Sequence, residues 1–173
     1  YQEKRKPSIS PFYDRETDLL FLGYKDTVTA FSNDLKLVRR ISPLNGLQVG
    51  ANVLAIQKDQ DGFYWFAGGR GLARYDWESN KLYSYSESNG RFNGDGSWVI
   101  HNDYYKRTWF GTKQGIYWYD NNVDSVKKLA AEEISGSVNL LGSIDSTWLI
   151  VSQPHGIYLM DLQKYHKSGK VEL

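Results

Sequence analysis

The sequence predicts an all-β fold, a β-propeller fragment of four blades in which each blade is a four-stranded antiparallel sheet. The first observation is an internal repeat that carries a Trp, a polar turn, a Gly and an Asp, and repeats of about 40–45 residues are typical of propeller blades. The second is the composition, because 13 Tyr, 6 Trp and 16 Gly among 173 residues suit strands and tight turns. The third is the lack of sustained helical periodicity, although residues 129–133 can hold a single turn.

Four copies of the repeat follow one another along the chain. Trp65 and Trp109 hold the same place in two copies, 44 positions apart, and Trp148 follows 39 positions later. The first copy is weaker, because Phe21 takes the place of the Trp, 44 positions before Trp65. The copies are Asp18–Phe31, Phe63–Asp76, Arg107–Asp120 and Ser146–Asp161. The structural positions of the repeat are Phe21, Trp65, Trp109 and Trp148, and, after the turn, Gly71, Gly115 and Gly156.

We predict a single β-propeller region over residues 1–173. Its approximate blades are 8–42, 52–87, 97–130 and 138–173. Turn-forming residues divide the second and third copies into strands at 52–58, 63–67, 71–75, 81–86, 97–102, 108–111, 115–119 and 125–129. A blade packs both faces on its neighbours, so a run such as Phe63–Phe66 is apolar throughout. Each repeated Trp is therefore predicted to lie buried between two blades.

The segments from Asp59 to Asp76 and from Trp109 to Asp120 resemble the two-component regulator propeller repeat. That repeat typically reads Asp-x-x-Gly-x-Leu-Trp-x-Gly-Thr-x-x-Gly-Leu-x-Arg-Tyr-Asp. The matching residues are Asp59 or Asp61, Gly62, Trp65, Gly71, Leu72, Arg74, Tyr75 and Asp76 in one copy, and Trp109, Gly111, Thr112, Gly115, Ile116, Tyr119 and Asp120 in the next. The last copy matches at Trp148, Gly156, Ile157 and Asp161, with a turn two residues longer and with Ile150-Val151 in place of Gly-Thr.

This resemblance implies a function and a location. The family forms the ligand-sensing, extracytoplasmic part of hybrid two-component sensor histidine kinases, common in Bacteroidetes, which often detect oligosaccharides. We therefore expect a periplasmic or otherwise extracytoplasmic module of signal transduction with a carbohydrate ligand. No kinase motif is present in the sequence, so we expect no enzymatic activity from this segment, although the parent protein is a candidate kinase. The chain begins at Tyr1, and we interpret it as a mature or excised segment without a signal peptide.

Charge and composition exclude several classes of partner and site. A net charge of +1 gives no electrostatic footprint for nucleic acid or for an anionic membrane surface. No apolar stretch approaches the roughly 20 residues that span a bilayer. The absence of Cys excludes disulfides, thiolate zinc sites and a Cys nucleophile. We predict no cofactor, no metal site and no catalytic residues.

The candidate ligand-binding residues lie in turns between the second and third strands of the blades. We expect these turns and the segments that enter each first strand to share one face, where propellers usually bind ligands. Arg70, Lys113, Gln114 and His155 offer hydrogen bonds to a sugar hydroxyl or carboxylate, and Tyr24 can stack on a sugar ring. The competing interpretation is that all five are ordinary solvated turn residues.

Other polar motifs are better explained by structure. Asp76, Asp120 and Asp161 recur at the end of the third strand, where an Asx turn accounts for each. The stretch 59–62 faintly resembles a calcium loop, but it lacks the further oxygen ligands. An enzyme propeller, a lyase or a glycosidase, remains an alternative, and on the candidate face only Asp26, Asp95 and His155 favour it.

Four blades are expected to form an open arc, or half of a larger ring. The end blades of such an arc expose apolar faces, which favours association. The expected partners are the remaining blades of a parent propeller or a second copy of the chain, and two copies make eight blades. A scaffold for protein assembly or secretion is a further alternative, since nothing in the sequence separates a scaffold from a sensor.

Overall fold

The computed structural model describes residues 9–50 and 52–172 of the chain. The predicted blade limits at residues 8 and 173 and the predicted start of the region at residue 1 lie outside the described residues. Within these ranges the chain forms fifteen β-strands and one short α-helix, so the predicted all-β fold is confirmed. The strands make four antiparallel sheets in which each strand pairs with the next one along the chain.

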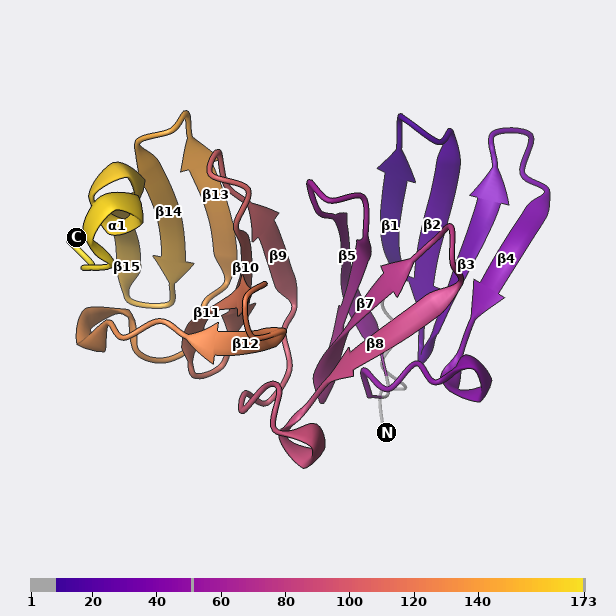
Figure 1. Cartoon of the computed structure of the whole chain (residues 1–173), viewed down its shortest axis with the longest axis horizontal. Coiled ribbons are helices and arrows are strands. Elements are labelled where there is room, and N and C mark those ends of the chain that lie inside the picture. The colour runs from indigo at the N-terminus through magenta and orange to yellow at the C-terminus, as the bar shows by residue number, and fades with distance from the viewer. Residues whose placement is uncertain (1–8, 51, 173) are drawn as a thin grey trace, which may run out of the picture.

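The four sheets stand side by side in sequence order (Figure 1). The first is β1 (Ile9–Asp14), β2 (Leu19–Tyr24), β3 (Thr27–Ser32) and β4 (Leu37–Ile41). The second is β5 (Val53–Lys58), β6 (Tyr64–Gly68), β7 (Gly71–Asp76) and β8 (Lys81–Tyr85). The third is β9 (Val99–Asn102), β10 (Thr108–Thr112), β11 (Gly115–Asp120) and β12 (Ser125–Lys128). The fourth is β13 (Leu140–Ile144), β14 (Trp148–Gln153) and β15 (Gly156–Asp161).

The fourth sheet corrects the prediction of four strands in every blade. Among the described residues it has three strands, and the helix α1 (Leu162–Ser168) follows β15 directly. The Asp161 side chain accepts a hydrogen bond from the Lys164 N–H and caps the helix. Leu162 and Tyr165 are buried on the side of the third sheet. A helix therefore takes the place in the chain where a fourth strand was expected.

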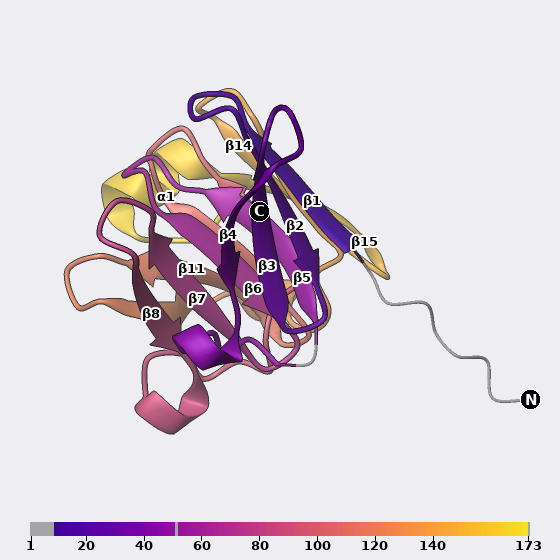
Figure 2. The ribbon, with the colours of Figure 1, turned by 90° about the vertical axis from the view of Figure 1, so that its right-hand side faces the viewer.

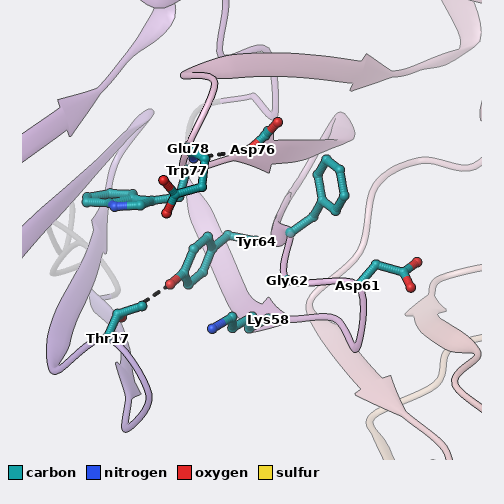
Figure 3. Close-up of a pocket in the computed structure, with 9 residues that line it drawn as sticks. Thr17, Lys58, Asp61, Gly62, Tyr64, Asp76, Trp77 and Glu78 are labelled. Carbon is teal, nitrogen blue, oxygen red and sulfur yellow. Dashed lines mark hydrogen bonds between the residues drawn. The ribbon is translucent and has the colours of Figure 1, made fainter.

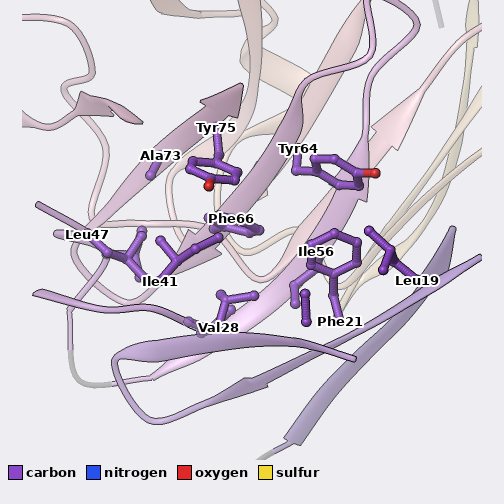
Figure 4. Close-up of a cluster of buried hydrophobic side chains, with 13 residues drawn as sticks. Leu19, Phe21, Val28, Ile41, Leu47, Ile56, Tyr64, Phe66, Ala73 and Tyr75 are labelled. Atoms are coloured by element: carbon purple, nitrogen blue, oxygen red, sulfur yellow. The ribbon is translucent and has the colours of Figure 1, made fainter. Parts of the chain in front are cut away.

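Three apolar clusters join the sheets in pairs. We call the face of a sheet that looks toward the next sheet its forward face, and the opposite face its rear face. Phe21, on the forward face of the first sheet, packs on Tyr64 with ring centroids 4.4 Å apart (Figure 4). Trp65 packs in the same way on Phe110 of the third sheet, at 4.9 Å. Trp109 lies in the cluster between the third and fourth sheets, so the large side chain of the repeat fills each internal junction.

In the last copy of the repeat, the strand pairing aligns residues differently from the alignment made on the sequence. The β14–β15 turn has two residues, like the β6–β7 and β10–β11 turns, so the two extra residues lie in β14 and not in the turn. Counted back from the turn, Ile150 takes the place of Trp65 and Trp109. Trp148 is on the same face but is only partly buried. It is not the buried wedge that the repeat predicts.

The segments that link the sheets lie against the turns between the second and third strands. The Arg70 N–H donates to the Val49 carbonyl at 3.1 Å, and the Ser97 N–H donates to the Gly68 carbonyl at 2.9 Å. The linkers carry the 3₁₀ turns Pro43–Asn45, Glu87–Asn89 and Glu132–Ile134, the last of which overlaps the predicted turn at 129–133. We call this side the linker edge and the other side the opposite edge. None of the described helices has the length and apolarity that a bilayer crossing needs.

Candidate ligand-binding surfaces

Arg70 lines an open hollow on the linker edge. It is exposed in the β6–β7 turn, where Gly50 of the preceding linker lies against its side chain. Gly50 has φ +95°, which Gly adopts without the strain of a side chain. The hollow has a volume of about 490 Å³, and Asp26, Gln48, Ser86 and Ser88 place polar side chains around it. No hydrogen bond or ion pair engages the Arg70 guanidinium within the described ranges.

Tyr24 lies in a different hollow. It is the last residue of β2, 43% exposed, and it points to the rear face of the first sheet. Its neighbours in a hollow of about 250 Å³ include Lys25, Thr29 and Arg40. The Lys25 ammonium lies 5.5 Å from the centre of the Tyr24 ring. Tyr24 is therefore available for stacking, but on a sheet face and not in the hollow that holds Arg70.

The other three candidates are separate from both hollows. The Gln114 amide donates to the Asp95 carboxylate at 3.0 Å and accepts from the Tyr117 hydroxyl at 3.2 Å, so its side chain is held in place. Lys113 and His155 are exposed in the β10–β11 and β14–β15 turns. The five predicted residues thus share an edge of the molecule or lie near it, but the structure does not bring them together.

A more enclosed hollow lies on the opposite edge, between the first and second sheets (Figure 3). Sequence reasoning missed it, because its residues come from three turns that are distant in the chain. Its volume is about 240 Å³. Tyr64 and Trp77 form an aromatic wall, and Lys58 and Glu78 line it with charge. The other lining residues are Thr17, Asp61, Gly62, Phe63 and Asp76.

The polar groups beside this second hollow are already paired. The Lys58 ammonium contacts Asp14 at 3.0 Å and Glu16 at 2.7 Å, and the Tyr64 hydroxyl donates to Asp14 at 2.5 Å. Burial disfavours the charged form of Asp14, but hydrogen bonds from Tyr64, Thr17 and Lys58 outweigh it and hold the carboxyl pKa well below its usual range. Burial and the bond to Asp14 together raise the pKa of Tyr64 to about 12. This network joins two sheets and leaves few groups free for a ligand.

A second series of carboxylates recurs in the turns between first and second strands. Asp59 accepts a hydrogen bond from the Trp65 indole N–H at 2.9 Å, and Asp103 accepts one from Trp109 at 2.8 Å. The sequence signal is the recurrence of Asp14, Asp59, Asp103 and Asp145, at intervals close to the repeat. Asp59 and Asp103 orient the structural residues Trp65 and Trp109, which is a role that the sequence did not reveal.

Of the three carboxylates at the ends of third strands, Asp76 and Asp120 cap their own turns, whereas Asp161 caps the helix α1 and forms no separate turn. Asp76 accepts from the Glu78 and Ser79 N–H groups, and Asp120 accepts from the Asn122 N–H. Both form the expected Asx turns. In residues 9–50 and 52–172, no group of three or more His, Asp or Glu side chains has the arrangement of a metal site.

Comparison with known proteins identifies the fold. No protein-family model and no curated protein sequence matches the chain. The extracellular domain of BT3049 from B. thetaiotaomicron, described as a hybrid two-component system, has a TM-score of 0.75 at 18% identity over 94% of this chain. The extracellular domain of BT4673 from the same species, described as a one-component system, has a TM-score of 0.72 at 18% identity over 99% of this chain. The chain spans 23% of the length of each.

Two further structures resemble the chain over a larger share of their own length. The WD40 β-propeller domain of Doa1 has a TM-score of 0.68 at 19% identity, over 95% of this chain and 52% of that one. U3-55K has a TM-score of 0.70 at 11% identity, over 94% of this chain and 51% of that one. Together with the four sheets, these similarities show that the chain is an open arc of a β-propeller, which matches part of larger propellers.

Proposed function

We propose that this chain is the carbohydrate-binding part of an extracytoplasmic sensor propeller, and that it binds its ligand without catalysis. The proposal is supported by the similarity of the fold to extracellular domains of bacterial one- and two-component systems. The observation that carries it is the hollow around Arg70 on the linker edge. The parent protein then transmits the binding event to a kinase in another segment.

The chemistry of the hollow favours an acidic sugar. The guanidinium of Arg70 presents several N–H donors in a fixed plane, which matches a carboxylate with two parallel hydrogen bonds. Asp26 and the Gln48 amide accept from sugar hydroxyls, and the hydroxyls of Ser86 and Ser88 can donate or accept. Because the hollow is open, it suits a few residues of an extended oligosaccharide rather than a small enclosed ligand.

The experiment is calorimetric titration with two matched oligosaccharide sets, one containing uronic acids and one neutral. We expect the uronate set to bind more tightly to the unchanged chain. Arg70→Ala removes a charged hydrogen-bond donor worth about 1.5–3 kcal/mol, so it should weaken uronate binding by about 10–100-fold. Neutral oligosaccharides should lose much less affinity.

The matched control is Arg15→Ala, which removes an exposed arginine on the opposite edge of the same pair of sheets. Its affinities should equal those of the unchanged chain. If Arg70→Ala leaves the preference for uronates intact, or if neither set binds, the proposed site is wrong.

A scaffold that docks other proteins is the second candidate function. The observation that favours it is the apolar forward face of the fourth sheet, where Ile157 is 72% exposed and Leu159 is 43% exposed. An enzyme propeller receives less support, because Asp95 is engaged by Gln114 and Asp26 shares its hollow with a cation and not with a second carboxylate.

A further inference from the structure

The dipeptide Asn-Gly occurs three times in the chain, and its asparagines are Asn45, Asn89 and Asn93. Such a pair is chemically reactive, because glycine has no side chain to hinder the attack of its own amide nitrogen on the side-chain carbonyl carbon of the asparagine. All three asparagines are exposed to solvent. Sequence and exposure therefore rank the three pairs equally, and only their hydrogen bonds distinguish them.

Asn45 ends the first 3₁₀ turn, where both reacting groups are held by other partners. Its side-chain oxygen accepts hydrogen bonds from the Ser42 N–H at 3.1 Å and from the Ser42 hydroxyl at 3.2 Å. The Gly46 N–H donates to the Pro43 carbonyl at 3.0 Å. Attack by the Gly46 nitrogen on the Asn45 side chain therefore requires the turn to open first.

Asn89 repeats this arrangement 44 positions later. Its side-chain oxygen accepts from the Ser86 N–H and from the Arg91 N–H, both at 3.1 Å. Its side-chain nitrogen donates to a backbone carbonyl at 2.8 Å. The Gly90 N–H donates to the Glu87 carbonyl at 3.1 Å. The second 3₁₀ turn thus holds its Asn-Gly pair as the first one does.

Asn93 lies beyond the second of these turns, in the linker that leads to the third sheet. Figure 2 shows the turns Pro43–Asn45 in violet and Glu87–Asn89 in pink, both on the linker edge. Among residues 9–50 and 52–172, no hydrogen bond engages the Asn93 side chain or the Gly94 N–H. Of the three pairs, this one has its two reacting groups free.

The fold requires the glycine of this pair. A Cβ at Gly94 would lie 2.5 Å from a ring carbon of Phe92 and 3.3 Å from one of Tyr117. Phe92 is itself buried between the second and third sheets. The packing of the linker therefore keeps an unhindered residue next to Asn93.

We infer that Asn93 is a site of spontaneous deamidation, and that the 3₁₀ turns protect Asn45 and Asn89. The Gly94 nitrogen loses its proton and attacks Cγ of Asn93. A C–N bond forms, the bond from Cγ to Nδ2 breaks, and the side-chain nitrogen leaves as ammonia. The succinimide ring that results takes up one water molecule and opens to aspartate or isoaspartate. This inference does not depend on the proposed ligand.

The reaction changes both the charge and the length of the linker. One new carboxylate brings the net charge of the chain from +1 to zero, and a net charge near zero promotes association. Isoaspartate also adds one atom to the main chain, two residues before Asp95. The Asp95 carboxylate accepts a hydrogen bond from the Gln114 amide at 3.0 Å, so the lengthened segment carries one partner of a contact with the β10–β11 turn.

The experiment is incubation of the purified chain in mildly alkaline buffer, followed by tryptic peptide mapping with mass spectrometry. Trypsin cleaves after Lys and Arg, so the three pairs fall in three separate peptides, 41–58, 82–91 and 92–106. Each deamidated peptide gains about one mass unit, and fragmentation locates the changed residue.

We expect Asn93 to react at least about tenfold faster than Asn45 or Asn89 in the folded chain. A factor of ten corresponds to a local opening free energy of about 1.4 kcal/mol for the turns.

Two controls separate the effect of the fold from that of the sequence. Incubation in concentrated guanidinium chloride removes the turns, so Asn45 and Asn89 should then react as fast as Asn93. Asn93→Gln should abolish the mass gain at this position in the folded chain, because a glutamine must close a larger and less favourable ring. Far-UV circular dichroism checks that this exposed substitution leaves the fold intact.

Equal rates at the three pairs in the folded chain would mean that the turns give no protection, and the inference would be wrong. It would also be wrong if Asn45 or Asn89 reacted ahead of Asn93. An Asn93 that stays intact in the folded chain, while it reacts in guanidinium chloride, would show that the fold protects this pair as well.

Discussion

At the scale of single residues, the carboxylate of Asp59 holds the second sheet to the third through its neighbours. It accepts hydrogen bonds from Trp65 and from Arg74, whose guanidinium is 2.9 Å away. Arg74 also lies over the ring of Tyr119 on the third sheet, at 4.8 Å. Both members of the ion pair are buried, so each needs the other to offset the loss of water.

Asp59→Ala is therefore predicted to lower the free energy of unfolding by about 3–5 kcal/mol, because it leaves a buried guanidinium without its main partner. The measurement is urea denaturation followed by Trp fluorescence. Asp61→Ala is the matched control, since the Asp61 side chain is 59% exposed at 3.3 Å from the same guanidinium. It should cost less than about 1 kcal/mol. Equal costs for the two variants would contradict a buried role for Asp59.

At the scale of elements, Gly115 and Gly156 start the third strands of the last two sheets and occupy the same place in the repeat. Gly115 has φ +121°, and a Cβ there would lie 2.9 Å from the Ile134 carbonyl oxygen of the following linker. Gly156 has neither constraint, because nothing lies within 4 Å of its Cβ position. The repeat preserves the residue, while the need for it depends on the neighbouring linker.

Gly115→Ala is predicted to destabilise the chain by about 1–3 kcal/mol through backbone strain, with the close contact adding to this cost. Gly156→Ala should change stability by no more than about 0.5 kcal/mol. Thermal unfolding of the two variants side by side checks the difference. A destabilisation by Gly156→Ala as large as that by Gly115→Ala would contradict the dependence on the backbone angle and linker contact of Gly115.

The strands were predictable because turn residues and the repeat mark their limits. All eight predicted strands of the second and third sheets agree with the structure to within two residues at either end. The helix α1 was missed, although Asp161 and Gly169 cap it and Leu162 and Tyr165 fall on one side. The repeat predicts a fourth strand at this place, and that prediction was preferred to the local helix signals. The helix forms where Tyr165 packs on Trp109.

The candidate site was only partly predictable. The sequence places Arg70 in a turn, and the repeat places that turn on the linker edge. It does not specify that Asp26 and Gln48 reach the same hollow, because that depends on how far one sheet is displaced from the next. The network of Asp14, Lys58 and Tyr64 was hidden for the same reason, since it links two sheets.

At the scale of the whole molecule, the sheets differ in how far neighbouring sheets bury them. Every residue of β6 and β10 is buried, because the second and third sheets have a neighbour on each side. Burial alternates along β14, because only its rear face packs on another sheet among the described residues. Local opening is easiest where few buried contacts hold the backbone, so the end sheets are expected to open before the middle ones.

Hydrogen exchange monitored by mass spectrometry tests this prediction. The amides of β14 and β15 should exchange faster than those of β6 and β10. The amides of β6 and β10 serve as the internal reference, because every residue of these two strands is buried. Equal protection of β14 and β6 would contradict the link between the burial of a sheet and its local opening.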